Sequence, residues 1–501
     1  MRQCLNMRHT PFFHIMTTIS VSYMNKLMLT AVATAVAACG YAADAVSLDS
    51  CRSMALRNNK MIRMAEETVK GAGYARKAAT AAYLPGIDFT GTYFYNQRQI
   101  ELLGADAKLP TMRFDPATQQ FSYNVLTAPD GTPVRDPATG GMIPTEVAVI
   151  HKEAMEFDTH NVFAGAFTLT QPIFMGGQIR ALNEIAKYGE LTARSARYAV
   201  AQEVVYTVDE AYWLVVSLRA KQRLAEGFVN LVDSLNNSVR AFYDNGMATR
   251  SDVLSVDVRL NEAQIARVKV DNGLALARMA LAQMCGVPVD TEMRLADEEL
   301  KDVGVCTAMP VYDMEDVYAR RQDLEVLRQG INLMKSKEKL ALGTMLPKIS
   351  AVGMYSFSNP NVIHGFEKKF GGGFSVGAAV TIPLWHWGGN YNQYRVARSA
   401  TKAQALLLED AEEKVNLQVS QARFKMTEAR KTYDMTLVNM DKADENLRQA
   451  RLGYREGVLT LDDVTAAQTA WLKAHSEKID AEIGIRLCDT YLAKVLGQLA
   501  Y

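Results

Sequence analysis

The chain has 501 residues, with 55 Lys and Arg balanced by 55 Asp and Glu, and 49% of its residues are hydrophobic. A net charge of zero argues against a nucleic-acid partner, which would need a clustered basic excess. The seven histidines and six cysteines lack metal-ligand spacing, and no phosphate loop or nucleophile motif is present. We therefore expect no enzymatic activity, no cofactor and no metal site.

Residues 1–42 are predicted to be a leader with an export signal, and Met24 is the expected true start. An apolar run over residues 27–38 follows, and it is too short to span a membrane as a helix. The residues ending at Cys39 resemble a lipobox, which would make Cys39 a lipidated N-terminus. The small residues after it suit ordinary cleavage after Ala42, which we favour, and lipidation of Cys39 stays open.

Four cysteines lie beyond this leader: Cys51, Cys285, Cys306 and Cys488. We expect them to be small buried side chains, which is the usual role of cysteine in a core. A disulfide between Cys285 and Cys306 stays open if the compartment is oxidising, although no spacing pattern supports it.

Residues 47–286 form the first of two predicted repeats. The apolar period changes from helical to alternating and back again, and the hairpin at its end keeps the 3-4 spacing of a coiled coil. Residues 97–160 are rich in Pro, Gly, Asp and Thr, which predicts a long loop, with short strands of its own as an alternative. The expected elements are a helix over 47–83, strands over about 86–96 and 161–172, and a helical hairpin over 178–286.

Residues 312–501 form the second repeat, after a linker over residues 287–311. The offset between the repeats is 211 residues in the long helices and 262 residues at the first strand of each half, because the first half carries the loop insertion. The expected elements are a helix over 312–344, strands over about 348–358 and 373–383, and a helical hairpin over 389–500.

The four predicted strands have the length and the single apolar face of membrane-spanning β-strands. An open four-stranded sheet would leave unpaired backbone groups in lipid, so we expect several chains to close a barrel. Two chains would give eight strands filled by side chains, and three would give twelve strands around a passage. A wet lumen is favoured because small or polar residues oppose the apolar face: Thr90, Thr92, Ala164, Ala166, Ser350, Gly377 and Ala379.

Each predicted hairpin turns at the same short motif. Residues 243–253 and 454–464 both have the pattern Tyr-x-x-Gly-x-x-Thr-x-x-Asp-Val. Glycine suits the end of one helix, threonine the N-cap of the next, and aspartate its first turn. Both segments are therefore predicted to be tight reversals between antiparallel helices.

Six motifs occur in the same order across this duplicated chain. With them the chain resembles the TolC-type outer membrane efflux proteins, also called outer membrane factors, over residues 47–499. The motifs are Leu84-Pro85-x-Ile87, Pro172-Ile173-Phe174-x-Gly176-Gly177, Leu346-Pro347-x-Ile349, Pro383-Leu384 with Gly388-Gly389, and the two reversals.

The resemblance implies a fold of the α plus transmembrane β class. Long antiparallel coiled-coil helices would form an α-barrel through the periplasm, and four strands per chain would contribute to a trimeric 12-stranded β-barrel in the lipid of the bacterial outer membrane. The implied partners are two further copies of the chain, a periplasmic membrane-fusion adaptor and an inner-membrane pump of the RND or ABC type. The chain would be a passive exit duct in a tripartite efflux or secretion system. The alternative that we keep is a non-channel, structural coiled-coil protein of the envelope.

The resemblance also assigns roles to the reversals. The expected gate or constriction residues are Asp463, Asp462, Asp252, Tyr454 and Arg250, and the expected adaptor-docking residues are Gly246, Met247, Gly457, Val458 and Leu459. Two positions depart from the family pattern, because Leu459 replaces a basic gate partner and Ala466 replaces a second carboxylate. Arg250 is therefore the expected substitute for the missing base.

Asp463 has an independent argument. Threefold symmetry would bring three copies to one constriction, where like charges attract cations and raise each other's pKa. The competing interpretation is an ordinary aspartate in the first turn of a helix.

Overall fold

The computed structural model describes residues 45–299, 310–361 and 367–499. The predicted leader, including Met24 and Cys39, lies outside the described residues, as does Cys306. Within the described stretches, no helix has the length and the hydrophobicity that crossing a bilayer requires.

The chain divides into two compact units. One contains residues 71–191 and 328–406, and the other contains residues 1–70, 192–327 and 407–501. The first unit holds the β-structure, and the second holds most of the helical structure.

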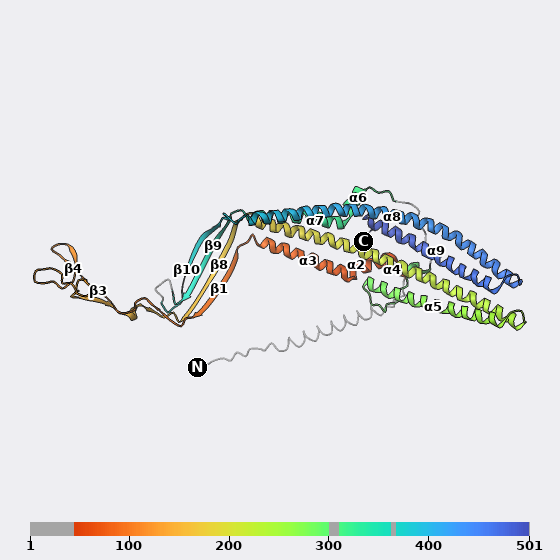
Figure 1. The fold of residues 1–501 in the computed structure, drawn as a ribbon, viewed down its shortest axis with the longest axis horizontal. Helices are drawn as coiled ribbons and strands as arrows, with labels where there is room; N and C mark the ends of the chain where they lie inside the picture. Colours follow the sequence, from red (N-terminus) through yellow and green to blue (C-terminus); the bar gives the residue numbers. More distant parts are fainter. Residues whose placement is uncertain (1–44, 300–309, 362–366, 500–501) are drawn as a thin grey trace, which may run out of the picture. The chain divides into compact units, whose positions relative to one another are not determined.

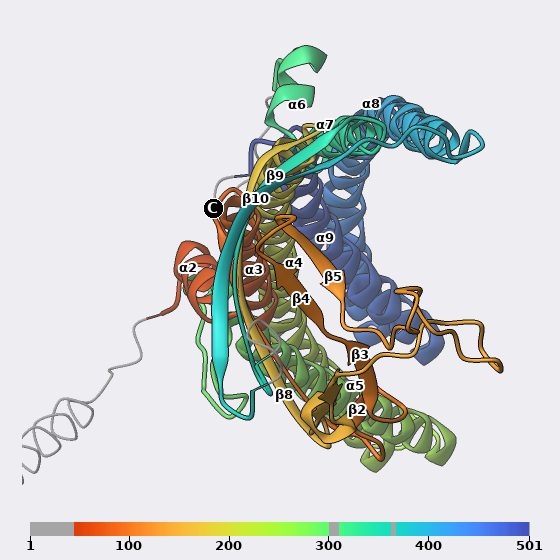
Figure 2. The same ribbon diagram turned by 90° about the vertical axis from the view of Figure 1, so that its left-hand side faces the viewer.

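The β unit is built on one antiparallel sheet with the strand order β1-β8-β9-β10, and Figure 2 shows that its strands bend along their length. β8 and β9 come from different halves of the chain, so the two repeats are joined inside the sheet. β1 and β10 lie at the edges. The strands are β1 (Gly86–Tyr95), β8 (Asn161–Met175), β9 (Lys348–Asn359) and β10 (Gly371–Thr381), and Figure 1 shows them side by side.

Two strand boundaries differ from the prediction. The strand expected over 161–172 continues to Met175, because the pairing of β8 with β9 shifts between Pro172 and Phe174 and then resumes. A bulge of this kind lets a proline without an N–H remain inside a strand. The strand expected over 373–383 begins and ends two residues earlier.

The insertion over 97–160 is a nested ribbon of short antiparallel strands rather than an unstructured loop. The outer pair is β2·β7, the middle pair β3·β6 and the inner pair β4·β5. The elements are β2 (Ile100–Glu101), β3 (Ala107–Pro110), β4 (Met112–Asp115), β5 (Gln120–Tyr123), β6 (Val147–Ile150), the 3-10 helix η1 (Lys152–Met155) and β7 (Glu156–Phe157).

The helical unit contains two long hairpins. α4 and α8 have 67 residues each and begin in the β unit, and the second hairpin repeats the first at an offset of 211 residues (389 − 178). One buried cluster near the reversals takes side chains from all four helices, including Val239, Val256, Leu447 and Val464. The helices are α4 (Gln178–Asp244), α5 (Arg250–Cys285), α8 (Gly389–Arg455) and α9 (Leu461–Val495).

Each of the two shorter helices expected before the strands is broken in the structure. The prediction of unbroken helices over 47–83 and 312–344 was therefore wrong. Asn59 and Arg321 stand at the breaks with extended backbone. The helices are α2 (Leu48–Asn58), α3 (Lys60–Ala81), α6 (Met314–Arg320) and α7 (Gln322–Gly343), with a 3-10 turn η2 (Ala296–Glu299) in the linker.

The breaks have one cause in both halves. Asn59 Nδ2 donates a hydrogen bond to Met284 O at 2.9 Å, and Arg321 Nη1 donates to Val495 O at 3.2 Å. Both carbonyls lie in the last turn of a return helix, where no intrahelical donor is available. The position of each break is therefore set by the distant helix end that Asn59 or Arg321 caps. The local helical pattern of the sequence cannot indicate such a contact.

A glycine follows each of these helix ends, and the two differ in how closely they are packed. Gly286 and Gly497 have φ values of +72° and +68°. A Cβ at Gly286 would lie 2.6 Å from Asn58 Cβ and 2.8 Å from its carbonyl carbon, whereas a Cβ at Gly497 would meet its nearest atom, Arg320 Cβ, at 3.0 Å.

Gly286→Ala is expected to destabilise the helical unit more than Gly497→Ala. Both variants carry the left-handed penalty of about 1–2 kcal/mol, and only the first adds a backbone clash. Gly227→Ala in the interior of α4, where a Cβ meets open space, should instead stabilise by about 0.8–1 kcal/mol. Local unfolding free energies from hydrogen exchange check the ranking, and equal losses at Gly286 and Gly497 would contradict it.

Candidate functional site

The first reversal is closed by two helix caps. Gly246 has φ +75°, and the N–H groups of Gly246 and Met247 donate to carbonyls in the last turn of α4 at 2.9 and 2.8 Å. This is the Schellman arrangement, which requires a left-handed residue. Thr249 then caps α5, and its side chain and that of Asp252 exchange hydrogen bonds with each other's backbone N–H. Gly246, Thr249 and Asp252 therefore each have a capping role, and Val253, the last fixed position of the motif, packs against the buried cluster near the reversals.

The second reversal repeats this geometry. Gly457 has φ +73°, and Val458 N–H donates back into α8 at 2.8 Å, while the carbonyl of Tyr454 accepts from Gly457 N–H at 3.1 Å. Thr460 and Asp463 form the capping box of α9. The predicted reversals, with glycine ending one helix and threonine capping the next, are thus present in both hairpins.

The two motif aspartates are engaged inside their own turns. Asp252 Oδ2 accepts from Thr249 N and Oγ1, both at 2.8 Å, and Asp463 Oδ2 accepts from Thr460 N and Oγ1 at 2.9 and 2.7 Å. Hydrogen bonds from the Thr460 hydroxyl and N–H lower the pKa of Asp463 below its ordinary value of 3.8. Its contribution to the turn is therefore present above pH 3.8 and is lost as the pH falls through the lower folded value.

Arg250 does not brace either aspartate in the structure. In the described part of the chain it forms no ion pair, and Asp252 is satisfied by Thr249 instead. The expectation that Arg250 replaces the missing base therefore stays a prediction, because the pair is not present within one chain. Asp462 is exposed, and its carbonyl accepts a hydrogen bond from Thr465 Oγ1 at 3.0 Å.

Tyr454 lies where the two hairpins meet. Its ring is 5.7 Å from that of Phe242 on α4, measured between centroids. Burial, and then the nearby charge of Asp252, raise the pKa of Tyr454. The structure thus brings two of the predicted gate residues, Tyr454 and Asp252, together across the hairpins.

The apolar tip residues differ in exposure. Met247 and Val458, at equivalent positions just after the glycines, are 70% and 78% exposed. Leu459 is 37% exposed, and its side chain folds back over Gly453, where an added Cβ would lie 2.7 Å from Leu459 Cδ1. Met247 and Val458 are therefore the most exposed of the large apolar side chains in the two reversals.

A polar cluster between α8 and α9 was not predicted from the sequence. Trp471 Nε1 donates to Asp444 Oδ1 at 2.6 Å, and His475 Nε2 lies 2.9 Å from the same oxygen. Trp471 also borders a groove of about 390 Å³ that Arg451 and Arg455 line. The spacing of four residues between Trp471 and His475 was the signal that could have indicated a shared partner.

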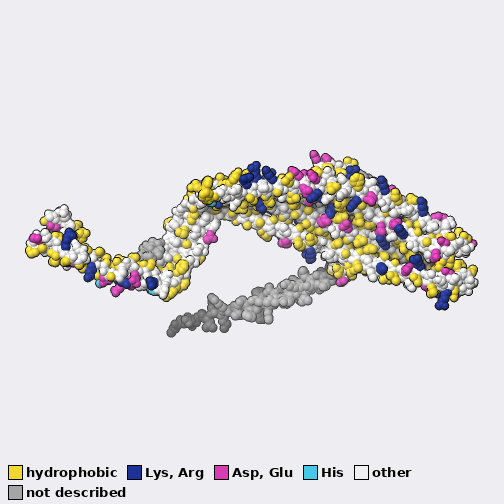
Figure 3. Space-filling model, viewed as in Figure 1, with side chains coloured by type: hydrophobic (Ala, Val, Ile, Leu, Met, Phe, Trp, Pro, Cys, Tyr) yellow, Lys and Arg dark blue, Asp and Glu magenta, His cyan; other side chains and the backbone are white. Residues whose placement is uncertain are grey.

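The sheet has two chemically different faces and almost no charge. Only Asp88 and Lys348 are charged among the residues of its four strands, and Figure 3 shows few charged side chains over this region in the face that it displays. Aromatic side chains pair across β1 and β8 on one face. Phe89 and Phe167 have ring centroids 4.8 Å apart, and both rings are about half exposed.

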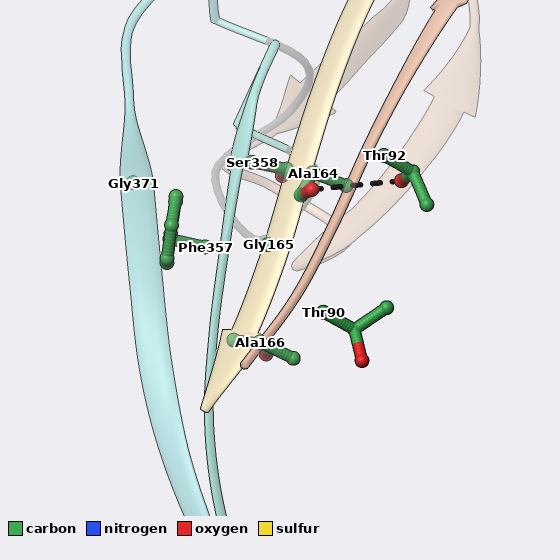
Figure 4. A pocket seen from close by; sticks show the side chains of 9 residues that line it. Thr90, Thr92, Ala164, Gly165, Ala166, Phe357, Ser358 and Gly371 are labelled. Atoms are coloured by element: carbon green, nitrogen blue, oxygen red, sulfur yellow. Dashed lines mark hydrogen bonds between the residues drawn. The ribbon is translucent and has the colours of Figure 1, made fainter. Parts of the chain in front are cut away.

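The opposite face carries small and polar side chains. A shallow groove of about 320 Å³ is lined there by Thr90, Thr92, Ala164, Ala166 and Ser358, as Figure 4 shows. Thr92 Oγ1 donates to Ala164 O across the strands at 3.5 Å. Among the described residues, no group of three or more His, Cys, Asp and Glu is placed to hold a metal ion.

Known proteins resemble this chain over most of its length. Protein CyaE of Bordetella pertussis is 23% identical over 337 residues, which are 67% of this chain and 70% of CyaE. The crystal structure of CusC has a TM-score of 0.69 at 15% identity, covering 90% of this chain and 91% of CusC. The outer membrane protein VceC of Vibrio cholerae has a TM-score of 0.66 at 14% identity, covering 90% and 96%.

These structural likenesses establish a shared fold. A family model described as outer membrane efflux protein matches residues 146–287 and 314–498, which are more than half of the chain and include both hairpins. The chain therefore belongs to the outer membrane efflux protein family.

Proposed function

We propose that the chain is a passive exit duct of a tripartite efflux or secretion system, in the outer membrane and extending into the periplasm. The observation that carries this proposal is the four-stranded sheet, which is nearly free of charge, has one apolar face and has an unpaired edge at β1 and at β10. Backbone groups along these edges cannot remain unpaired in lipid. The edges must therefore pair with other copies of the chain.

The internal repeat gives the register of that pairing. Phe89 pairs with Phe167 between β1 and β8, and Ala351 pairs with Ala378 between β9 and β10, so β9 follows β1 by 262 residues and β10 follows β8 by 211. Thr168 pairs with Met354 where β8 meets β9. If β10 meets β1 of the next chain in the same register, the equivalent pair is found by adding 211 to 168 and subtracting 262 from 354. That pair is Ala379 of β10 and Thr92 of β1 in the next chain.

The end of β8 indicates which neighbour a closed ring of strands would supply at the end of β10. A Cβ at Gly176, after β8, would lie 2.5 Å from Gly343 O at the end of α7. At the offset of 211 residues, the position equivalent to Gly176 is Trp387, and both have positive φ, +62° and +51°. The residue that corresponds to Gly343 is Ala81 at the end of α3, which we propose that the next chain supplies.

Three chains fit this ring better than two. Eight strands would be filled by their own side chains, and twelve enclose a passage. The small side chains of the groove in Figure 4 would then line a lumen, and the aromatic face would contact outer-membrane lipid. The four long helices of each chain would continue the passage as a twelve-helix α-barrel.

Six reversals would ring the periplasmic mouth of such a trimer. The exposed Met247 and Val458 offer apolar contacts to a periplasmic membrane-fusion adaptor, with Gly246, Gly457 and Leu459 shaping the turns that present them. An inner-membrane pump of the RND or ABC type would deliver the substrate and supply the energy.

Asp463→Asn is expected to change single-channel conductance or its block by divalent cations, because it removes three like charges from a threefold constriction. Thr460→Val is the matched control, since it deletes the partner hydroxyl and keeps the charge. If both variants alter conductance equally, the carboxylate acts through the turn and not through its charge. The same pair of changes at Asp252 and Thr249 tests the first reversal.

The proposed function is tested by reconstitution. Purified protein in planar lipid bilayers is expected to show discrete conductance steps, and unheated protein from outer-membrane fractions should migrate as a trimer that heating converts to monomers. A structural coiled-coil protein of the envelope, the alternative, would give no conductance and no association through its strands.

A further inference from the structure

Two buried cysteines meet where α2 packs on the end of α5. Cys51 lies in the first turn of α2 and Cys285 is the last residue of α5, and both side chains are 0% exposed. The Cys285 thiol donates a hydrogen bond to Cys51 O, with Sγ 3.7 Å from that oxygen. Both residues belong to the same compact unit.

The surrounding contacts hold the two backbones at this separation. Asn59, which follows α2, donates to the carbonyl of Met284, which precedes Cys285. Gly286, which follows Cys285, leaves no room for a Cβ against Asn58. A disulfide requires neighbouring backbones, and the Cys285 side chain reaches the backbone of Cys51 itself.

We propose that Cys51 and Cys285 form a disulfide in the exported protein. The inference rests on the proposed export to the envelope, which is an oxidising compartment. It replaces the Cys285–Cys306 pairing left open from the sequence, because Cys51 already occupies the space beside Cys285.

The chemistry is an exchange with a thiol–disulfide oxidoreductase of the envelope. The thiolate of one cysteine attacks the disulfide of the oxidant, forms a mixed disulfide and releases one thiolate of the oxidant. The second cysteine then attacks the chain's own sulfur in that mixed disulfide and releases the other thiolate. The chain loses two protons and two electrons, and the oxidant leaves as a dithiol.

Oxidation must precede burial of the pair. Both side chains are 0% exposed, so an oxidoreductase cannot reach either thiol in the folded chain. The two residues are 234 positions apart, and the bridge would therefore tie the N-terminal helix to the far end of the first hairpin. A long closed loop restricts the unfolded chain strongly.

Acid trapping tests the proposal on the wild-type protein. Cells are quenched in acid, free thiols are blocked under denaturing conditions, and disulfides are then reduced and given a second label. Trypsin leaves Cys51, Cys285, Cys306 and Cys488 on separate peptides. The second label is expected on Cys51 and Cys285 and the first on Cys488. The first label on both Cys51 and Cys285, or a link from Cys285 to Cys306, would overturn the proposal.

Reduction supplies a second readout. Dithiothreitol should lower the denaturant midpoint of wild type and of Cys488→Ser, and leave the midpoint of the Cys51→Ser/Cys285→Ser double variant unchanged. An unchanged wild-type midpoint counts against the bridge. Two experiments separate the proposed function from the disulfide. Cell fractionation tests whether the chain is in the envelope, and refolding of purified protein with oxidised glutathione tests whether the bridge forms. A chain absent from the envelope contradicts the proposed function, whereas an envelope chain with both thiols free contradicts the disulfide.

Discussion

Replacing Val376 by arginine is expected to keep the protein out of the outer membrane. Val376 lies at the middle of β10 on the apolar face of the sheet, and its side chain is 79% exposed in a single chain. An arginine at the midplane of a lipid-facing strand costs about 2–4 kcal/mol, and a trimer carries three copies. The amount of heat-modifiable protein in the outer-membrane fraction measures the effect.

Ser375→Arg is the matched control, because Ser375 is the preceding residue and faces the opposite side of the sheet. It should insert normally and alter conductance, since the proposed lumen accepts charge. Equal exclusion of both variants would show that the sheet does not separate a lipid face from a wet face.

Arg52→Met is expected to destabilise the helical unit by about 3–5 kcal/mol, because it leaves a buried carboxylate unpaired. Arg52 Nε and Nη2 donate to Asp209 Oδ1 and Oδ2 at 2.7 and 2.6 Å, and the Asp209 side chain is 0% exposed. Hydrogen exchange in α2 and in the centre of α4 reports the loss.

Two controls distinguish loss of the pair from loss of packing. Asp209→Leu should cost less, because the guanidinium left behind is 23% exposed and also contacts Asp49 at 3.2 Å. The double variant Arg52→Met/Asp209→Leu should recover most of the stability, since it leaves no unpaired charge. A double variant as unstable as Arg52→Met would contradict the electrostatic explanation.

The pH dependence has a definite sign. Burial raises the pKa of Asp209 above its ordinary value of 3.8, and Arg52 opposes that shift. A carboxyl whose folded pKa is raised favours folding most below pH 3.8 and loses that contribution as the pH rises through the folded value. Arg52→Met, which removes the opposing charge, should therefore gain stability on acidification, and the double variant should not.

Local chemistry in the sequence was sufficient to predict the reversals. Glycine in the left-handed region and threonine before a helix have few other uses, so Gly246, Gly457, Thr249 and Thr460 indicated their caps directly. The same logic limits the functional assignment. The motif aspartates are explained within one chain by their capping boxes, and a gate role for Asp252 and Asp463 rests on the proposed symmetry.

Contacts between distant segments could not be predicted in this way. The helix breaks at Asn59 and Arg321 depend on the carbonyls of helices more than 170 residues away, and each flanking segment is helical by composition. The approach of Cys51 to Cys285 has the same origin, because the end of α5 creates it. Arg250 was expected to pair with an aspartate because no other basic residue lies in the reversals at the required position. Within one chain, the hydroxyl of Thr249 hydrogen-bonds to Asp252 instead.

Cross-linking across the proposed chain boundary tests the closed trimeric barrel most directly. In one chain, positions 92 and 379 lie on opposite edges of the sheet with β8 and β9 between them, about 14 Å apart across the strands. The pairing sets Thr92 level with Gly371, so position 379 is also eight residues, or about 26 Å, further along β10 (379 − 371). A disulfide between Thr92→Cys and Ala379→Cys can therefore form only between chains. Asp88→Cys with Ala379→Cys is the off-register control, displaced by four residues or about 13 Å along β1.

Oxidation of Thr92→Cys/Ala379→Cys in isolated outer membranes, followed by denaturing electrophoresis without reductant, is the measurement. We predict a covalent product that stops at three chains, with little product from the off-register pair or from either single cysteine. A product that stops at two chains, a ladder that continues past three, or equal linking by the off-register pair would contradict the twelve-stranded duct.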